Sequence, residues 1–423
     1  MDKLVNKYAR KLAQAGLAEE TGPLSPIVGG LDDTLVWNRT GPETDILEQV
    51  FKGLNINSLV FLRPKAPYDK IIEFLARQAL LGNDLIEPKD CETRTFLHDL
   101  PVVDKFSADK IIQALKKRKC VIVAAPEEAG NFQGPAIIAH GTVSPEQGFV
   151  VASSVCFACF VKFFADYLEN LQKGKASRES DDLFDLLSPM VGCDLPPDVT
   201  PPLTSGQTRD LPDLAQGPFS TEEQIYAAIV QAGRKTVEYG LVDSYFGNVS
   251  YCRDNILYIS QTGSSLDELA GCIDPVPLDG SSSAGLTASS ELTAHIQTIA
   301  LTCCDAILHG HPKFSVILSM DCDPKEKALC AHRDHCHIRC PKKRFVNQVP
   351  IVPGEVGTGP TGLCNTLPQA FGVSNHVIVY GHGVFTLGRD DFSQAFATLL
   401  EVETNCRITY FKKVRHLRYA SGI

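Results

Sequence analysis

The residues best suited to chemistry in this chain of 423 residues are three histidines in its C-terminal half. His309 and His311 stand two positions apart at the end of a short apolar run, 306–308, that predicts a strand. Side chains at i and i+2 of a strand point to the same face, so both imidazoles can reach one metal ion. His382 lies between two glycines at the end of a second predicted strand, 376–380. Three neutral imidazoles with an open coordination position predict a catalytic metal site, and the alternative is strand-end histidines hydrogen-bonded locally.

Two serines and a glutamate open the helix that is predicted before these histidines. Ser289 and Ser290 precede Glu291, which lies 18 residues before His309. The N-terminus of a helix binds anions through its free N–H groups and its dipole, so two hydroxyls there suit a phosphate. A carboxylate close to a metal can take a proton from a carbon or hydroxyl next to a carbonyl. Taken alone, the pattern also describes an ordinary helix N-cap with an acidic first turn.

The composition limits the partners and the compartment. The chain has 40 Lys and Arg against 50 Asp and Glu, a formal charge of −10, which argues against nucleic acid and membrane as partners. The fifteen cysteines are an odd number, and residues 1–7 contain no apolar signal core, so a cytoplasmic location is expected. The longest apolar stretch, 149–161, is shorter than the roughly 18 residues that span a bilayer and predicts a buried helix.

Prolines and charges divide the chain. Residues 172–182 are charged and lack periodicity, and five prolines follow between 196 and 212. Proline at this density blocks both helices and central strands, so 172–217 is predicted to be an extended linker. It would separate an N-terminal α/β domain, 1–171, from a C-terminal domain, 218–423.

The C-terminal domain alternates helix and strand patterns. Ser220 and Glu223 have capping-box spacing at the start of a predicted helix that ends near Tyr239. A strand is predicted at 255–260, and a long helix at 392–411 closes the domain. Strands with interspersed helices predict an α/β or α+β layered domain.

Five short motifs of this domain, spread over about 218–411, resemble those of the class II aldolase/adducin family. They are Gly247-Asn248-Val249-Ser250, Thr262-Gly263-Ser264, Ser289-Ser290-Glu291, His309-Gly310-His311-Pro312 and Gly381-His382-Gly383. The family includes fuculose-phosphate aldolase, ribulose-phosphate 4-epimerase, methylthioribulose-phosphate dehydratase and the non-catalytic head of adducin. The resemblance implies a three-layer domain around a mostly antiparallel sheet.

The resemblance also implies a role for each matching residue. His309, His311 and His382 would bind a divalent metal, zinc in the first place, with manganese, iron or cobalt as alternatives. Glu291 would be the acid/base. The substrate phosphate would be held by Asn248, Thr262, Gly263, Ser289 and Ser290.

The implied reaction is that of a metal-dependent, aldolase-type lyase. It would cleave or form a C–C bond in a phosphorylated ketose, or a related hydroxy-carbonyl compound, through a metal-stabilised enediolate. A sugar-phosphate dehydratase or decarboxylase with the same site, and a non-catalytic adducin-like scaffold, are the alternatives. A glutamate at 291 favours the aldolase or dehydratase branches, because the epimerase branch has an aspartate there. The resemblance further implies a homo-oligomer, either a dimer of tandem chains or a tetramer, in which Tyr410 or Tyr419 of a neighbouring subunit could act as the acid.

A second cluster of soft ligands follows the histidine pair. Cys322, Cys330, Cys336 and Cys340 are interleaved with histidines, and Cys336 and Cys340 have loose zinc-ligand spacing. The cluster is interpreted as a second metal site, as a lid loop with incidental cysteines, or as a redox-labile group of thiols.

The two halves of the chain resemble each other. Residues 33–41 resemble 255–263, and 120–126 resemble 376–382. Glu43 precedes Arg63 by 20 residues, as Glu291 precedes His311. In this alignment Phe61, Arg63 and Pro126 take the three metal positions, so the first half is interpreted as a degenerate copy that cannot bind the metal. The alternative is chance similarity between two α/β segments.

Overall fold

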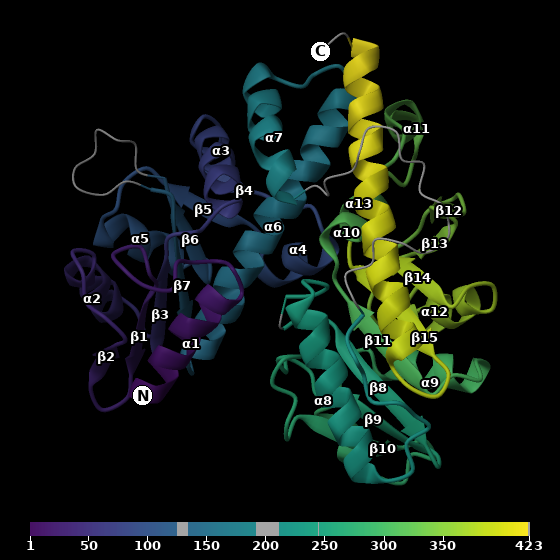
Figure 1. The fold of residues 1–423 in the computed structure, drawn as a ribbon. Coiled ribbons are helices and arrows are strands. Elements are labelled where there is room, and N and C mark those ends of the chain that lie inside the picture. Colours follow the sequence, from purple (N-terminus) through teal and green to yellow (C-terminus); the bar gives the residue numbers. More distant parts are fainter. Residues whose placement is uncertain (125–133, 192–210, 244, 422–423) are drawn as a thin grey trace. The chain divides into compact units, whose positions relative to one another are not determined.

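The computed structural model describes residues 1–124, 134–191, 211–243 and 245–421 (Figure 1). They form two compact units. Unit 1 comprises Met1–Asp166 and Ser177–Val191, and unit 2 comprises Tyr167–Ala176 and Gly192–Ile423. Each unit contains one mixed sheet with helices around it, as expected of an α/β chain.

The sheet of unit 2 has eight strands in the order β10-β9-β8-β11-β15-β14-β13-β12. Their bounds are β8 Asn248–Arg253, β9 Ile256–Ser260, β10 Ile273–Pro277, β11 Ala306–Gly310, β12 Arg344–Val346, β13 Val349–Val352, β14 His376–Val379 and β15 Gly383–Gly388. Neighbouring strands are antiparallel except β13 and β14, which are parallel. The predicted mostly antiparallel sheet is confirmed, with one parallel pair that makes it mixed.

Helices cover both faces of this sheet, which gives the predicted three layers. The helices of unit 2 are α8 Glu222–Glu238, α9 Leu292–Leu301, α10 Lys313–Met320, α11 Pro324–Leu329, α12 Leu363–Phe371 and α13 Ser393–Ser421. On one face, α9 and α12 share a core with Ile307 of β11. On the other face α13 lies so close to β11 that a Cβ on Gly310 would meet Leu399 at 3.1 Å. Because alternate residues of a strand face opposite ways, β11 is sandwiched between the two helix layers.

The start of α8 differs from the prediction by one residue. Its N-cap is Thr221, whose hydroxyl accepts from the backbone N–H of Gln224, while the Gln224 side chain accepts from the Thr221 N–H. The predicted pair of Ser220 and Glu223 was therefore wrong. Both pairs have the same spacing. The Gln224 side chain, which also accepts from the Ser220 N–H, determines that the capping box is formed by Thr221 and Gln224.

Unit 1 has a seven-stranded sheet in the order β2-β1-β3-β7-β6-β5-β4. Its strands are β1 Ile27–Leu31, β2 Leu35–Trp37, β3 Ser58–Leu62, β4 Leu85–Ile86, β5 Leu100–Val103, β6 Cys120–Val123 and β7 Ala136–Gly141. Its helices are α1 Asp2–Gln14, α2 Thr44–Gly53, α3 Tyr68–Leu80, α4 Cys91–Leu97, α5 Ala108–Leu115, the part of α6 up to Asp166, and α7 Arg178–Val191. Only β5 and β6 are parallel among the described pairs.

Part of the predicted linker is helical. Helix α7 occupies 178–191, and its side chains Phe184 and Leu187 are buried. These two residues have helical i, i+3 spacing, which the charged and proline-rich surroundings concealed. The linker prediction was therefore wrong for this segment, and residues 192–210 lie outside the described part of the chain.

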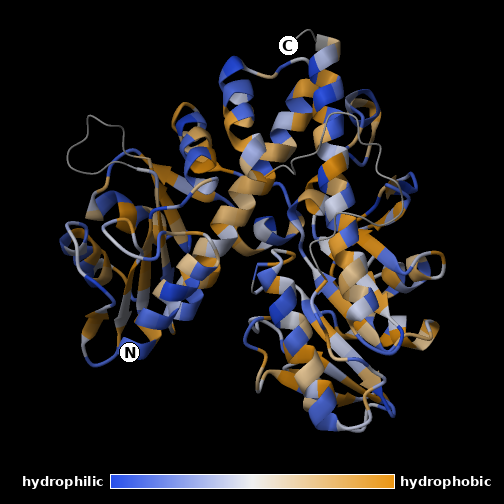
Figure 2. Ribbon diagram, viewed as in Figure 1, coloured by the Kyte–Doolittle hydropathy of each residue, from blue (hydrophilic) through white to orange (hydrophobic). Residues whose placement is uncertain are grey.

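The apolar stretch predicted as a buried helix belongs to helix α6, Pro145–Gln172, which is hydrophobic over much of its length (Figure 2). Its 28 residues, with a mean hydropathy of 2.0 in the most apolar window, would suffice to cross a membrane by length and composition. Of that window, 89% is buried inside the structure, so the prediction of a buried helix is confirmed. Lys162, which follows the apolar stretch, still lies within the helix and pairs with Asp166 one turn later.

Candidate active site

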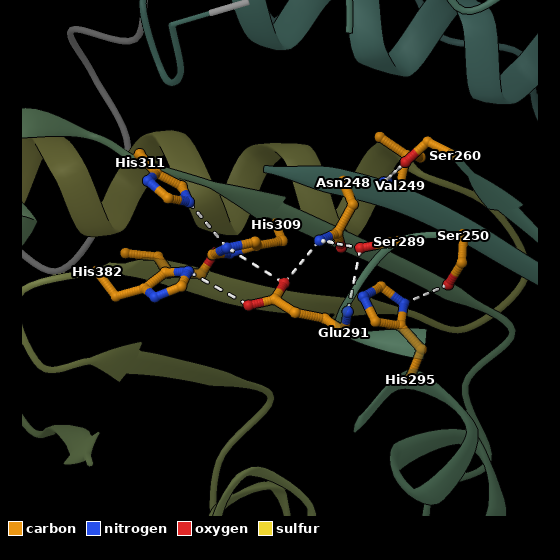
Figure 3. A network of polar contacts seen from close by, with 11 residues as sticks. Asn248, Val249, Ser250, Ser260, Ser289, Glu291, His295, His309, His311 and His382 are labelled. Carbon is orange, nitrogen blue, oxygen red and sulfur yellow. Dashed lines mark hydrogen bonds and ion pairs between the residues drawn. The ribbon is translucent and has the colours of Figure 1, made fainter. Parts of the chain in front are cut away.

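Three histidines converge where two interior strands of unit 2 meet (Figure 3). His309 lies on β11 and His311 follows this strand. His382 lies in the turn from β14 to β15, and β15 pairs with β11 so that Val384 is opposite Gly310. The ring nitrogens that the three residues offer lie within 4.8 Å of one another. The strand pairing thus joins two motifs that are 71 residues or more apart in the sequence.

Hydrogen bonding and stacking fix the rings. The Nδ1–H of His309 donates to the Val384 carbonyl at 3.0 Å, because a carbonyl oxygen only accepts. The neutral ring therefore presents a lone pair at Nε2, which lies 3.0 Å from Nε2 of His311. The His309 ring stacks on Phe385 with centroids 3.8 Å apart, and the His311 ring stacks on Phe246 at 5.2 Å.

A buried carboxylate faces the histidines. Glu291 is the N-cap of α9 and is 5% exposed. Its Oε1 lies 3.3 Å from Nε2 of His382, and its Oε2 lies 3.6 Å from Nε2 of His309. The Asn248 amide donates to Oε2 at 2.6 Å. No lysine or arginine of the described residues pairs with Glu291, so its polar neighbours are two imidazoles and an amide.

Burial sets the protonation states at this site. It lowers the pKa of His309 to about 4 and lowers the pKa of His311 well below its ordinary value. Burial alone would raise the pKa of Glu291, but the imidazoles of His309 and His382 and the hydrogen bond from Asn248 hold it below its usual range. At neutral pH His309 and His311 are therefore neutral, and Glu291 is an ionised carboxylate.

This donor set fits a divalent cation. Three imidazole nitrogens are a zinc ligand set, and nitrogens bound to one tetrahedral zinc lie about 3.4 Å apart. The three ligand nitrogens lie within 4.8 Å of one another, and the Nε2 atoms of His309 and His311 are 3.0 Å apart. A cation there would also balance the charge of Glu291. His309, His311 and His382 are the residues that would hold it.

The residues predicted to bind phosphate divide into two groups. Asn248 and Ser289 support the carboxylate, since Asn248 Nδ2 donates to Ser289 Oγ at 3.1 Å and Ser289 Oγ accepts from the Glu291 N–H at 3.3 Å. Thr262, Gly263 and Ser290 lie at the surface. A backbone bridge between Gln261 and Ala288, with the Thr262 N–H donating to the Thr287 carbonyl, joins the two segments that carry these exposed residues.

Glycine is required where the chain passes the histidines. A Cβ on Gly383 would lie 2.3 Å from the Gly310 carbonyl oxygen and 2.8 Å from Cε1 of His309. Gly247 has φ +80°, and a Cβ there would lie 2.3 Å from the His309 carbonyl oxygen. Both strands can approach β11 this closely only because these positions carry no side chain.

Helix α10 connects two of the histidines, a feature that the sequence did not reveal. Its N-terminus directly follows His311, and the Glu403 carboxylate of α13 accepts from the Phe314 and Ser315 N–H groups at 3.0 and 2.9 Å. Near its C-terminus, Ser319 Oγ accepts from the Gly381 N–H at 2.8 Å and so holds the turn that carries His382. Glu403 lies 92 residues after His311, so no local pattern could identify it.

His295 is a second residue that was not predicted for the site. It lies one turn after Glu291, and its Nδ1 is 2.7 Å from Ser250 Oγ. Burial lowers the pKa of His295 to about 4, so the ring is neutral. Its i+4 spacing from Glu291 on α9 was the available signal.

Replacing Ser319 by alanine is expected to weaken metal binding about tenfold. The substitution removes the acceptor of the Gly381 N–H and frees the turn that orients His382, and groups that orient metal ligands typically contribute 10–100-fold to affinity. Chelator competition with Zn²⁺ measures the effect. Ser58→Ala is the matched control, because Ser58 is also buried and donates to the Ser144 carbonyl, but in unit 1. Equal affinities of the two variants would contradict the expectation.

The cysteine cluster does not form a second metal site of the predicted kind in the structure. The segment folds as helix α11 followed by turns, and Cys322, Cys330, Cys336 and Cys340 are all free. Over the described ranges, the histidine triad is the one set of three or more His, Cys, Asp or Glu side chains whose ligand atoms converge. The zinc interpretation of 322–340 thus gains no support from the geometry.

The two tyrosines named as acid candidates are placed differently. Tyr410 is fully buried, packs against Phe314 and Phe411, and has its pKa raised well above the ordinary value by burial. Tyr419 is 78% exposed near the end of α13. Of the two, only Tyr419 is accessible to a second subunit.

Comparison with known proteins identifies the family of the segment that carries the site. Residues 227–410 match the family described as Class II Aldolase and Adducin N-terminal domain. L-fuculose-1-phosphate aldolase from Thermus thermophilus is 21% identical, with a TM-score of 0.37, over 46% of this chain and 97% of that chain. YgbL from Klebsiella pneumoniae is 24% identical, with a TM-score of 0.37, over 47% and 100%. No curated protein matches. The resemblance of the C-terminal motifs to the class II aldolase and adducin family is therefore confirmed by a family match over residues 227–410.

Proposed function

We propose that unit 2 is a metal-dependent lyase of the aldolase type that acts on a phosphorylated ketose or a related hydroxy-carbonyl compound. One observation carries the proposal: an ionised carboxylate, Glu291, is buried 3.3–3.6 Å from two of three convergent imidazoles. A scaffold has no need of such a group, because burying a carboxylate without a cationic partner is costly.

A divalent cation held by His309, His311 and His382 would supply Lewis-acid polarisation of a substrate carbonyl. Zinc suits three imidazoles best, with manganese, iron or cobalt as alternatives. The three ligands leave a coordination position open, as catalytic sites do and structural zinc sites do not. All three rings are buried, so little water competes for the site.

Glu291 would act as the base. C–C cleavage beside a carbonyl requires a proton to leave the hydroxyl on the far carbon, and an ionised carboxylate can accept it. Oε2 is held by the Asn248 amide, so Oε1, which faces His382, is the oxygen that would take the proton. Asn248 and Ser289 are positioning residues in this scheme, because they fix the carboxylate and not the substrate.

The substrate phosphate would contact the exposed residues Thr262, Gly263 and Ser290. Ser290 directly precedes the N-cap of α9, where free N–H groups favour an anion. The same location lies within one residue of Glu291 through Ser290. A phosphorylated small molecule can thus contact both the anion site and the carboxylate.

Incubating the zinc-loaded protein with a panel of sugar phosphates tests the proposal. Mass spectrometry should show two carbonyl products from a phosphorylated ketose, and a chelator should abolish them. One product lighter by a water would identify a dehydratase, and CO₂ release would identify a decarboxylase. Absence of turnover across the panel in a chain without bound metal would favour the adducin-like scaffold. The homo-oligomer and the cytoplasmic location stay predictions.

A further inference from the structure

The two sheets have the same strand order. The order in unit 1 is β2-β1-β3-β7-β6-β5-β4, and the order in unit 2 without β10 is β9-β8-β11-β15-β14-β13-β12. Each strand of unit 1 thus has a counterpart in unit 2 at the same place in the sheet and in the same order along the chain. The single parallel pair falls at the same place, β5 with β6 and β13 with β14. Strand β10 has no counterpart in unit 1. It lies between residues 263 and 289, a segment for which the first half of the chain has no equivalent in the sequence alignment. Each sheet is followed by a long helix, α6 or α13.

The register agrees independently with the sequence alignment. That alignment equates Phe61 with His309, and the sheets then pair Phe61 with Ile138 and His309 with Phe385. The next strands pair Ile138 with Val121, and Phe385 with Val377. Val121 and Val377 are also equivalent when 120–126 is aligned with 376–382. Two separate stretches of sequence similarity are therefore connected consistently by hydrogen bonding across three strands.

Irregular backbone hydrogen bonds repeat as well. Helix α1 ends with N–H donation from Leu17 to Leu12 and has Gly16 at φ +70°, and α8 ends with donation from Leu241 to Thr236 and Gly240 at φ +68°. Beyond the helices, three further bonds recur at aligned positions. The bond from the Leu31 N–H to the Asn57 carbonyl corresponds to that from Cys252 to Asp305. The bond from the Ala124 N–H to the Val103 carbonyl corresponds to that from Tyr380 to Val352. The bond from the His140 N–H to the Lys119 carbonyl corresponds to that from Leu387 to Asn375. Chance similarity of two α/β folds does not reproduce such details.

The position of the metal site is occupied differently in unit 1. Glu43 precedes α2, as Glu291 precedes α9, and is also buried. Its Oε1 accepts from Nη2 of Arg63 at 2.7 Å, with side-chain exposures of 7% and 20%. Arg63 is aligned with His311, and Phe61 replaces His309 with an apolar ring. Pro126, which would replace His382, lies outside the described residues.

We propose that unit 1 is a second copy of the unit 2 fold in which the Arg63 guanidinium replaces the metal as the counter-charge of the retained carboxylate, Glu43. The statement that Arg63 takes the place of a metal rests on the function proposed for unit 2, whereas the ion pair itself is present in the structure. A guanidinium is permanently charged and is not a metal ligand. The residues described there thus do not fit a metal, and unit 1 is a non-catalytic copy in which an ion pair takes the place of the metal centre.

A mutant cycle on the full-length protein tests this assignment. Arg63→Met should lower the thermal midpoint by ~5–10 °C, because it leaves a buried carboxylate without its partner. The double variant Glu43→Gln with Arg63→Met should recover most of the loss, since no charge is then left unpaired. Arg77→Met is the matched control: Arg77 pairs with Glu179 at the same 2.7 Å but with both side chains about half exposed, so its effect should be small.

Metal analysis of the same proteins completes the test. Wild type and Arg63→Met should each hold one divalent ion per chain, and His309→Ala should hold none. A second ion that survives His309→Ala and is lost in Glu43→Gln would overturn the proposal, as would a double variant no more stable than Arg63→Met. If wild type holds no metal at all, the function proposed for unit 2 fails, while the mutant cycle still decides the role of the ion pair.

Discussion

Replacing His309 by alanine is expected to lower Zn²⁺ affinity more than 100-fold and to abolish turnover with any substrate of unit 2. The tautomer of His309 is fixed by the Val384 carbonyl, and its Nε2 approaches both His311 and Glu291. Substitutions of groups that only orient ligands cost 10–100-fold, so loss of a ligand should exceed that range. Metal content by elemental analysis and affinity by chelator competition measure the effect.

The control for this experiment is His376→Ala. His376 is also a strand residue of unit 2, at the start of β14, but it pairs locally with Asn375 and lies outside the triad. It should retain one ion per chain. If His309→Ala kept both its metal and its activity, the metal centre assigned to these histidines would be wrong.

Replacing Glu291 by glutamine is expected to lower turnover by ~10²–10⁴-fold while the metal stays bound. The amide has nearly the shape of the carboxylate and can still accept from Asn248, but it cannot take a proton, and proton transfer by a positioned side chain contributes about this factor. The Michaelis constant should change little, because Glu291 is not placed at the phosphate. Steady-state kinetics with the substrate found in the panel, together with metal analysis, measures both effects.

Glu43→Gln is the matched control for Glu291→Gln. Glu43 is the aligned carboxylate of unit 1, and it too is a buried residue before a helix. Turnover should be unchanged in this variant once its folding has been verified. A Glu291→Gln protein with wild-type turnover would remove the carboxylate from the reaction, whatever the metal content.

The site could be predicted largely because its parts are local motifs. Two histidines spaced for one strand face, and a histidine between glycines at a strand end, are visible in the sequence, and strands β11 and β14 lie where the apolar runs 306–308 and 376–380 predicted. The helix that begins after Glu291 was equally visible from its N-cap residues. Antiparallel pairing of β11 with β15 then brings these motifs together.

The remainder depends on contacts between distant residues. Asn248 was assigned to the phosphate, whereas its amide donates to Glu291, 43 residues later. Glu403 and Ser319 act through hydrogen bonds to backbone groups, which leave no pattern in the sequence. Helix α7 and the cap of α8 were missed for another reason, since proline and charge hid the first and two overlapping capping patterns competed for the second.

The triad lies on and at the ends of interior strands, and this placement would govern how fast a bound ion could leave. β11 is hydrogen-bonded to β8 on one side and to β15 on the other, and β15 is in turn bonded to β14. Edge strands fray readily, but interior strands exchange their amide protons only in larger openings of the sheet. The strands that carry or flank the ligands would therefore not open by fraying, and release of an ion would have to wait for a side chain to rotate or for the sheet itself to open. The strand order would therefore affect the residence time of a bound ion as well as its affinity.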